Sequence, residues 1–272
     1  MRRKDRAYGY VYAVLTGIVL IVFAFPLIWM LLASFKTQIQ MQSTSHFFIF
    51  EPTLRNYTQV FQENNFLKYM INSAIVAIGS TAGGLLLGLP AAYGIARFRM
   101  PGLALTILVA RIVPGITFLI PWFILFSQLN LIDSYTALIL AHMLVSLPFI
   151  IWVMIPFFES LPLEIEEAAL IDGSTRAGVF LRTVIPISGP GIITSSLMSA
   201  IFSWNNFLFS LVLAGEKTKT LPIAIFNFIS YSEVNWGGLM AAATVITLPI
   251  IVISLFAQRY VISGLSAGAV KG

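Results

Sequence analysis

Three polar residues, Trp204, Asn205 and Asn206, interrupt an otherwise apolar stretch of the sequence. Successive side chains on a helix point about 100° apart, so one partner cannot easily satisfy both carboxamides. Amides beside an indole ring provide the hydrogen-bonding groups and the apolar face that suit the rims and faces of sugar rings. The alternative is hydrogen bonding between helices, worth about 1 kcal/mol for each amide. The three residues are therefore a candidate substrate path.

Arg111 is the only Lys or Arg within the apolar stretches. Placing such a charge at the centre of a membrane helix costs about 3 kcal/mol on insertion scales. We therefore expect its guanidinium to face protein or water, with a role in the path or in a conformational change. The structural alternative is snorkelling, or hydrogen bonding to helix carbonyls in a static kink near Pro114.

Residues that could support covalent chemistry are scarce. His142 is a single histidine in an apolar stretch, without a second ligand three or four residues away, so packing is favoured over a metal or proton site. The chain has no cysteine, which excludes disulfides and thiolate metal sites. The phosphate-binding pattern G-x-x-x-x-G-K-[ST] is missing as well. We predict a protein that is not an enzyme and binds no metal or cofactor.

The composition indicates that these residues belong to a membrane protein. Only 10% of the chain is charged and 58% is hydrophobic, with a mean hydropathy of +0.90, whereas soluble domains are about 25% charged. Short segments of alternating polarity are absent, which excludes a lipid-exposed barrel. A membrane helix needs about 20 apolar residues, and six stretches qualify, at roughly 11–34, 70–96, 103–127, 136–157, 191–214 and 239–258. The predicted fold is all-α, a polytopic membrane protein with six transmembrane helices in a single domain, 1–272.

The distribution of Lys and Arg predicts the orientation, because cytoplasmic loops carry an excess of these residues. With the N-terminus inside, the cluster Arg2–Arg6 lies beside the first helix. The outer segments then hold only Lys36, Arg55, Lys68, Lys217 and Lys219. Both termini are predicted to be cytoplasmic. The net charge of +5 reflects this orientation, since no basic patch with interleaved aromatics indicates nucleic acid.

Two further patterns lie inside the predicted spans. Internal prolines are tolerated in membrane helices, and five spans contain them: Pro26, Pro90, Pro114 with Pro121, Pro148 and Pro249. They are interpreted as static kinks, with hinges between rocking helices as the alternative. Small residues recur every four positions and include a GxxxG pattern: Ser80, Gly84, Gly88 and Ala92. Because small residues let helix backbones approach, this pattern predicts helix packing rather than substrate contact.

The stretch EEAALIDGSTRAGVFLRTVIP, residues 166–186, is unusually charged for this chain and falls in the predicted cytoplasmic loop 159–188. Pro162 suits the first turn of a helix, and the acidic residues that follow it favour the positive end of the helix dipole. Gly173 can end that helix in a left-handed conformation, and Ser174 can cap the next one. The pattern predicts a short amphipathic helix and a bend, suited to a partner protein or to lipid headgroups.

Glu167-Ala168-Ala169, with Gly173 six residues after the Glu and Ile185-Pro186 beyond, resembles the EAA loop of ABC importer permeases. The family pattern is E-A-A, three residues, G, nine residues, I-x-L-P; here Thr183 and Ile185 replace the Ile and the Leu. In that family the short helix docks in a cleft of the ATPase subunit and passes movement to the pore. The resemblance implies an ATPase-coupling set: Glu166, Glu167, Ala168, Ala169, Asp172, Gly173 and Pro186.

The resemblance covers essentially the whole chain and is closest to carbohydrate-importer permeases. Its other motifs are Arg111-x-x-Pro114 with Pro121, the Trp-Asn-Asn run within 197–213, and the ending GLSAGAVKG at 264–272. That ending is similar to the small permease subunit of maltose-type systems, whose tail inserts between the ATPase subunits. It implies an ATPase-interface tail within the cytoplasmic end 260–272, comprising Gly268, Val270, Lys271 and Gly272. Residues 263–272 have small side chains and little reason to fold alone, so we expect an extended tail.

The resemblance implies a permease subunit of an ATP-driven carbohydrate importer in a bacterial cytoplasmic (inner) membrane, working by alternating access. Its implied partners are a second homologous permease, two ATPase subunits, an extracytoplasmic sugar-binding protein and membrane lipid. Arg111, Trp204, Asn205 and Asn206 form the candidate substrate path. A polyol or glycerol derivative is the alternative solute. An ion-coupled secondary transporter is less favoured, since no Asp or Glu lies within the six spans to relay protons.

Overall fold

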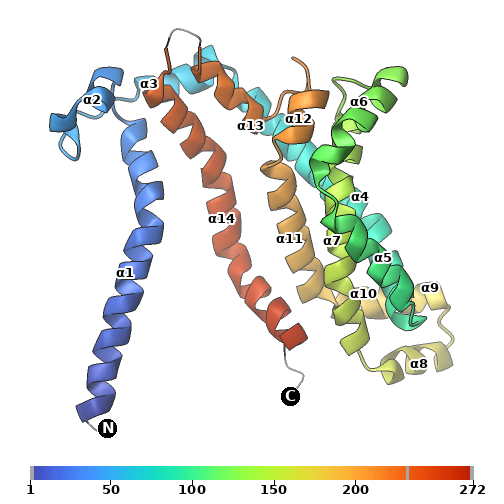
Figure 1. Ribbon diagram of the computed structural model, residues 1–272. Coiled ribbons are helices and arrows are strands. Elements are labelled where there is room, and N and C mark those ends of the chain that lie inside the picture. Colours follow the sequence, from blue (N-terminus) through green and yellow to red (C-terminus); the bar gives the residue numbers. More distant parts are fainter. Residues whose placement is uncertain (1–2, 231–232, 270–272) are drawn as a thin grey trace. The chain divides into compact units, whose positions relative to one another are not determined.

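The computed structural model describes the backbone of residues 3–230 and 233–269; the side chains of residues 1–9, 46, 231–232, 256–257 and 259–272 are not described. Helices dominate this part of the chain, whose one β contact is an isolated bridge between Ile229 and Val234. The all-α prediction is confirmed. Figure 1 follows the helices in chain order: α1 (Arg3–Ser34), α2 (Gln38–Gln42), η1 (Thr44–His46), α3 (Arg55–Thr58), η2 (Gln59–Glu63), α4 (Phe66–Arg97), α5 (Pro101–Ile112), η3 (Gly115–Phe118), α6 (Leu119–Gln128), α7 (Tyr135–Ser160), α8 (Leu163–Ile171), α9 (Arg176–Val179), η4 (Phe180–Val184), α10 (Ile185–Ile187), α11 (Gly189–Trp204), α12 (Leu208–Leu213), α13 (Leu221–Ala224), η5 (Ile225–Phe228) and α14 (Trp236–Ala269).

Four helices of the described chain are long and apolar enough to cross a membrane: Tyr10–Ser34 within α1, α4, α7, and Trp236–Leu255 within α14. Two bent helix pairs raise the total to six if each pair is one span. The first pair, Pro101–Ile112 with Gly115–Gln128, bends by 87°. The third predicted span is therefore not one continuous helix. Pro114 disfavours a helical conformation in the residue before it, and Val113 is extended, with ψ of 122°.

The fifth predicted span, 191–214, is also interrupted, because α11 ends before Asn205 and α12 begins after Asn206. The Asn205 side-chain amide donates to the carbonyl of Ile201 at 3.0 Å, and Asn206 Oδ1 accepts from the N–H of Phe209 at 3.1 Å. Local bonds of this kind compete with the helical hydrogen-bond ladder. The two amides therefore form the break in the helix.

The sixth predicted span, 239–258, lies within α14, which continues to Ala269. The backbone of residues 263–269 is thus helical, and the expectation of an extended tail is wrong for them. Continuing a helix needs no new nucleus and gains one hydrogen bond for each added residue, which explains how small residues remain helical here. Of the predicted ATPase-interface tail, Gly268 lies in this helix. The other three members lie outside the described residues: Val270, Lys271 and Gly272.

The contacts divide the chain into two compact units: unit 1 is residues 1–66 with 225–248, and unit 2 is residues 67–224 with 249–272. In unit 2 the glycine-containing face of α4 packs on α7. A Cβ added at Gly84 would lie 2.8 Å from Ile150 Cδ1, and one at Gly88 would lie 3.0 Å from Ile150 Cγ2. Larger residues would force the helices apart, so the packing predicted for GxxxG is confirmed.

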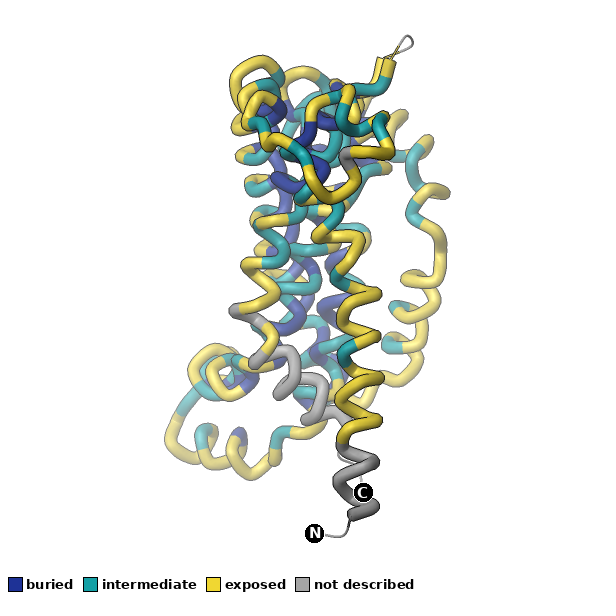
Figure 2. The backbone as a smooth tube through the Cα atoms, turned by 90° about the vertical axis from the view of Figure 1, so that its left-hand side faces the viewer, coloured by how far each residue is buried: buried dark blue, intermediate teal, exposed yellow. Residues whose placement is uncertain are grey.

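The first helix presents a broad apolar surface. None of the most apolar stretch of Tyr10–Ser34 is buried, and the helix that rises from the N-terminus is mostly exposed in Figure 2. Phe23, for example, is 75% exposed. A surface of this kind on a membrane protein faces lipid or another subunit.

At the start of α4, side chains hold segment 215–221 in place. The Asp133 carboxylate accepts hydrogen bonds from three backbone N–H groups of this segment and from the Thr218 hydroxyl, at 2.7 to 3.1 Å. Asn72 donates to two carbonyls of the same segment, at 2.8 and 3.1 Å. Because side chains satisfy these backbone groups, the segment has a defined conformation at this end of unit 2.

Asp133 makes the stability of this segment depend on pH. Burial opposes ionisation of its carboxyl group, but the bonds from Thr218 and from backbone N–H groups outweigh burial and lower the pKa of Asp133 below its ordinary value of 3.8. A lowered pKa stabilises the folded state above the unfolded pKa and loses that contribution as the pH falls through the folded pKa. We expect Asp133→Asn to lower the melting temperature at pH 6, with a gap that narrows below pH 3.8. Melting curves in detergent would test this against Glu51→Gln, an exposed control; a gap independent of pH contradicts the assignment.

In unit 1, a buried lysine fixes the chain that follows α1. Lys36 is 2% exposed; its Nζ donates to the Phe47 carbonyl at 2.7 Å and lies 4.5 Å from the ring centroid of Trp29 and 4.9 Å from that of Phe50. Burial lowers the pKa of Lys36, and the carbonyl and the ring faces compensate its charge. Asn56 Nδ2 donates to the Lys36 carbonyl at 2.8 Å. These contacts hold the polar segments of unit 1 in a defined arrangement.

Candidate functional site

The charged segment forms a helical hairpin in unit 2, with α8 as its first arm. Gly173 follows the C-terminal cap of α8, Asp172, and its φ of +87° lies in the left-handed region. The N–H of Gly173 donates to the carbonyl of Leu170, and the N–H of Ser174 donates to the carbonyl of Ala169, both at 3.0 Å. These two bonds are the Schellman ending of a helix, which favours glycine at this position. The predicted short helix and glycine stop are both confirmed, but the helix is not amphipathic, because its buried residue is Glu166 and its longer apolar side chains are exposed.

The second arm, α9, begins one residue later than predicted. Its N-terminal cap is Thr175, whose hydroxyl accepts from the N–H of Gly178 at 3.1 Å. The predicted cap at Ser174 is wrong. The backbone N–H of Ser174 completes the Schellman turn of α8, so Ser174 belongs to the bend between α8 and α9. η4 and α10 then follow, and α10, which contains Pro186, leads into α11; Figure 1 shows these two helices.

Glu166 joins the hairpin to the end of α4. Its carboxylate accepts from Arg97 Nε at 2.6 Å and from the Tyr93 hydroxyl at 2.5 Å, and it forms an ion pair with Arg97 Nη2. Arg97 also donates to the carbonyl of Leu161 at 3.3 Å. The Tyr93 ring packs against Phe158 of α7 and Phe180 of η4. This partly buried cluster of charges and rings joins α8 to α4.

The predicted coupling set divides between two faces of the hairpin. Glu166 is 8% exposed and directed toward α4, and Ala169 packs partly against the core cluster around α4 and α7. The remaining members are exposed: Glu167, Ala168, Asp172, Gly173 and Pro186. The sequence pattern treated Glu166 and Glu167 alike, whereas the structure gives them different surroundings.

Arg111 lies in the last turn of α5, directly before the break at Pro114. It is exposed, and its guanidinium lies 4.9 Å from the ring centroid of Phe149 and 4.8 Å from that of Trp152, both on α7. Phe149 in turn packs edge-on against Phe202 of α11. Cation–π contacts of this kind are attractive. One side of the Arg111 side chain therefore contacts α7, and the rest of the side chain is exposed.

The two amides of the candidate path have different structural roles. Asn206 is partly buried and caps α12 through the bond to Phe209. Asn205 is exposed, and its amide makes only a bond to the preceding turn. Trp204, the last residue of α11, is partly buried. Of the two amides, Asn205 is the one available to a solute.

A seam of buried hydroxyls, which the sequence reasoning missed, joins α4, α7 and α11. His142 is 3% exposed, and its Nδ1 lies 2.7 Å from Ser203 Oγ. Ser80 Oγ donates to the same Ser203 oxygen at 3.0 Å, and Thr81 and Ser199 pair at 3.2 Å. The Nδ1 contact agrees with the packing interpretation of His142, but its buried Nε2 has no hydrogen-bond partner among the described residues. The available signal was the four-residue spacing of three small polar residues on α11: Ser195, Ser199 and Ser203.

Comparisons with known proteins agree with this geometry. Residues 84–266 match the family described as binding-protein-dependent transport system inner membrane component. The chain is 36% identical to the sulfoquinovosyl glycerol transport system permease protein SmoH of Agrobacterium fabrum, over 91% of this chain and 89% of that protein. It is 36% identical to the trehalose transport system permease protein SugB of Mycobacterium tuberculosis, over 81% of this chain and 82% of that protein.

A solved structure shares the fold. It is a chain in the crystal structure of a bacterial ABC transporter involved in the import of the acidic polysaccharide alginate. The TM-score is 0.77 at 22% sequence identity, and the match covers 96% of this chain and 98% of that chain. The arrangement of helices is therefore one that solved membrane transporters also adopt.

Proposed function

The chain belongs to the family of binding-protein-dependent transport system inner membrane components, and we propose that it is the permease subunit of an ATP-driven carbohydrate importer. Its relatives named for trehalose and for sulfoquinovosyl glycerol support a sugar or sugar derivative as the solute. The alternative solute class, a glycerol derivative, is close to the second of these names. A role as a transport subunit leaves ATP hydrolysis to partner proteins.

The observation that carries the proposal is the hairpin mounted on α4. Glu167 and Ala168 are exposed on α8, while Glu166 holds the same helix to Arg97. An ATPase subunit bound to the exposed face would move α8, and the buried ion pair would carry that movement into α4. This helix has 32 residues, or about 48 Å at 1.5 Å per residue. Its other end holds segment 215–221 through Asn72.

The partners follow from the family and from the charge distribution. A binding-protein-dependent system requires a solute-binding protein, and we infer a second permease and two ATPase subunits that complete the importer. The excess of Lys and Arg supports cytoplasmic termini and a cytoplasmic hairpin. The end of α14 and the residues after it, 260–272, would then contact the ATPase subunits from the same side of the membrane.

Reconstitution tests this assignment. The chain is purified with the partner permease, ATPase subunits and binding protein encoded beside it, and the complex is placed in proteoliposomes. We expect uptake of labelled sugar only when ATP is inside, hydrolysis is possible and the binding protein is outside. Uptake that persists without the ATPase subunits would instead support an ion-coupled secondary transporter.

The two amides at the helix break should differ when replaced. We expect Asn205→Leu to reduce sugar uptake severalfold without changing assembly or basal ATP hydrolysis, because its exposed amide stabilises no other helix. Asn206→Leu removes the cap of α12 and should lower stability by about 1 kcal/mol. Uptake and thermal unfolding of each single variant separate the two effects. Full transport in both single variants and in the double variant would remove Asn205 and Asn206 from the path.

A further inference from the structure

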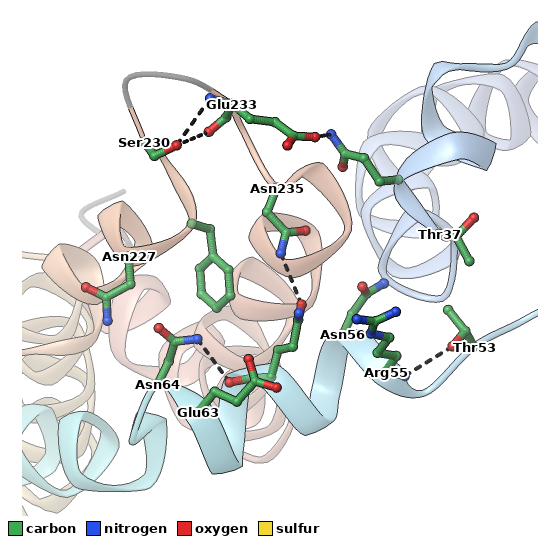
Figure 3. A pocket seen from close by; sticks show the side chains of 13 residues that line it. Thr37, Thr53, Arg55, Asn56, Glu63, Asn64, Asn227, Ser230, Glu233 and Asn235 are labelled. Carbon is green, nitrogen blue, oxygen red and sulfur yellow. Dashed lines mark hydrogen bonds between the residues drawn. The ribbon is translucent and has the colours of Figure 1, made fainter.

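Unit 1 contains a pocket whose lining includes none of the predicted path residues. Its volume is about 520 Å³, and it lies among the segments after α1, the short helices α3 and η2, and the chain before α14 (Figure 3). Twelve of its thirteen lining residues are polar, the exception being Phe228. Ligand sites of 300–1,000 Å³ are usually mostly apolar, so this lining favours a ligand covered with hydrogen-bonding groups.

The walls of the pocket are held in place by their own amides. Asn235 Nδ2 donates to Gln59 Oε1, and Asn64 Nδ2 donates to the Gln59 carbonyl, each at 3.0 Å. Asn235 Oδ1 accepts from the N–H of Gly238 at the start of α14, at 2.9 Å. The bond from Asn235, drawn in Figure 3, links the chain before α14 to η2. A site with positions fixed before binding loses less entropy when a ligand is bound.

The hydrogen-bonding groups of the pocket that have no partner among the described residues include both donors and acceptors. Among the described residues, no partner is present for the Gln59 amide N–H groups or for the Arg55 guanidinium, which are donors. The same holds for Asn64 Oδ1 and the Glu63 carboxylate, which are acceptors. A hydroxyl group both donates and accepts. A ligand with several adjacent hydroxyls therefore satisfies this set, whereas an ion of either sign satisfies only half of it.

The charges of the pocket narrow the ligand class further. Arg55 contributes one positive charge, and Glu63 and Glu233 contribute two negative charges, so the pocket has no cationic excess for an anion. Phe228 also lines the pocket, but its side chain is 4% exposed and packs against Phe66, so the groups that a ligand meets are almost entirely polar. We propose that this pocket binds a neutral saccharide of one or two rings. The choice of saccharide rests on the proposed function, whereas the hydroxyl-rich class follows from the pocket itself.

Binding to the full-length chain in lipid nanodiscs tests the proposal without ATP or partner proteins. Calorimetric titration with trehalose and with maltose is compared with sodium sulfate and glycine betaine, an anion and a zwitterion. We expect saturable binding of at least one sugar, and weakening by about tenfold or more in the double variant Arg55→Met/Glu63→Leu, because hydrogen bonds to charged groups are the stronger ones. Neither side chain has a partner to lose, so the variant should fold. Gln62→Leu is the matched control, since Gln62 is exposed on the same helix and lies outside the pocket.

Three results would overturn the proposal. The first is absence of saturable sugar binding, and the second is sugar binding that the double variant leaves unchanged. The third is loss of binding in Asn205→Leu with the pocket intact, which would place the sugar in unit 2. If sugars fail to bind while the double variant weakens association with the solute-binding protein, the pocket is a protein-docking surface. Uptake by the reconstituted importer is measured separately, so the pocket and the transport function can fail independently.

Discussion

Reversing the charge of Glu166 should abolish most ATP-coupled sugar uptake while the chain still inserts into the membrane. Glu166→Arg places a second cation against Arg97, in a site where the two side chains are only 12% and 11% exposed. Leaving a buried charge without its partner costs about 3–5 kcal/mol, and about 1.4 kcal/mol already changes an equilibrium tenfold. We expect ATPase co-purification and coupled uptake to fall by about tenfold or more.

Three further variants test whether the loss of uptake comes from the contact between Glu166 and Arg97 or from a general loss of folding. Glu164→Arg makes the same charge reversal on an exposed position of α8 and should change uptake little. Tyr93→Phe removes one hydrogen bond to the carboxylate and should have an intermediate effect. The exchange Glu166→Arg/Arg97→Glu restores an ion pair and should recover part of the lost uptake. A double variant no better than Glu166→Arg alone, with monodisperse protein in each case, would show that the pair does not transmit movement.

The contact between Glu166 and Arg97 could not be predicted from the sequence. Adjacent residues on a helix point about 100° apart, so the period alone indicates that Glu166 and Glu167 face different surroundings. Which of them turns inward depends on Arg97, 69 residues earlier in the chain. Contacts across this separation come from helix packing, which a local pattern does not contain.

The membrane helices could be predicted because length and apolar composition are local properties. Their interruptions were harder to predict for different physical reasons. Pro114 breaks the third span, while Pro26, Pro90 and Pro148 lie within continuous helices, because neighbouring groups can accommodate a proline. At Asn205, the helix ends through side-chain bonds that apolar composition does not reflect. A search for apolar stretches therefore does not detect a helix break that one pair of polar residues produces.

The pocket of unit 1 had no signal in the sequence. Its residues come from 37–64 and from 227–235, with no shared period and no known motif. Their arrangement depends on Lys36 and Asn56, which hold the chain after α1. Lys36 was interpreted only as a charge outside the membrane, although it is 2% exposed. A buried cation of this kind becomes visible only when the aromatic rings that surround it are brought together.

Replacing Gly173 should change the turn between α8 and α9 while leaving the packing of the core unchanged. Its φ of +87° is disfavoured for residues with a Cβ, by about 1–2 kcal/mol, and a β-branched residue is worse still. No atom lies within 4 Å of a Cβ added there, so steric overlap is not the cause of any effect. We expect Gly173→Val to strain the Schellman turn, redirect the exposed face of α8, and lower ATPase co-purification and coupled uptake severalfold.

The matched control for this substitution is Gly173→Asn, because asparagine adopts the left-handed region more readily than other residues with a Cβ. If backbone conformation is the cause, uptake should decrease in the order glycine, asparagine, alanine, valine, although alanine is the smallest replacement. Loss that follows side-chain volume instead would indicate that Gly173 itself lies in a tight contact with the ATPase subunit. Equal uptake in all four proteins would show that the turn does not set the position of α8, and the hairpin would then be held by Glu166 and Arg97 alone.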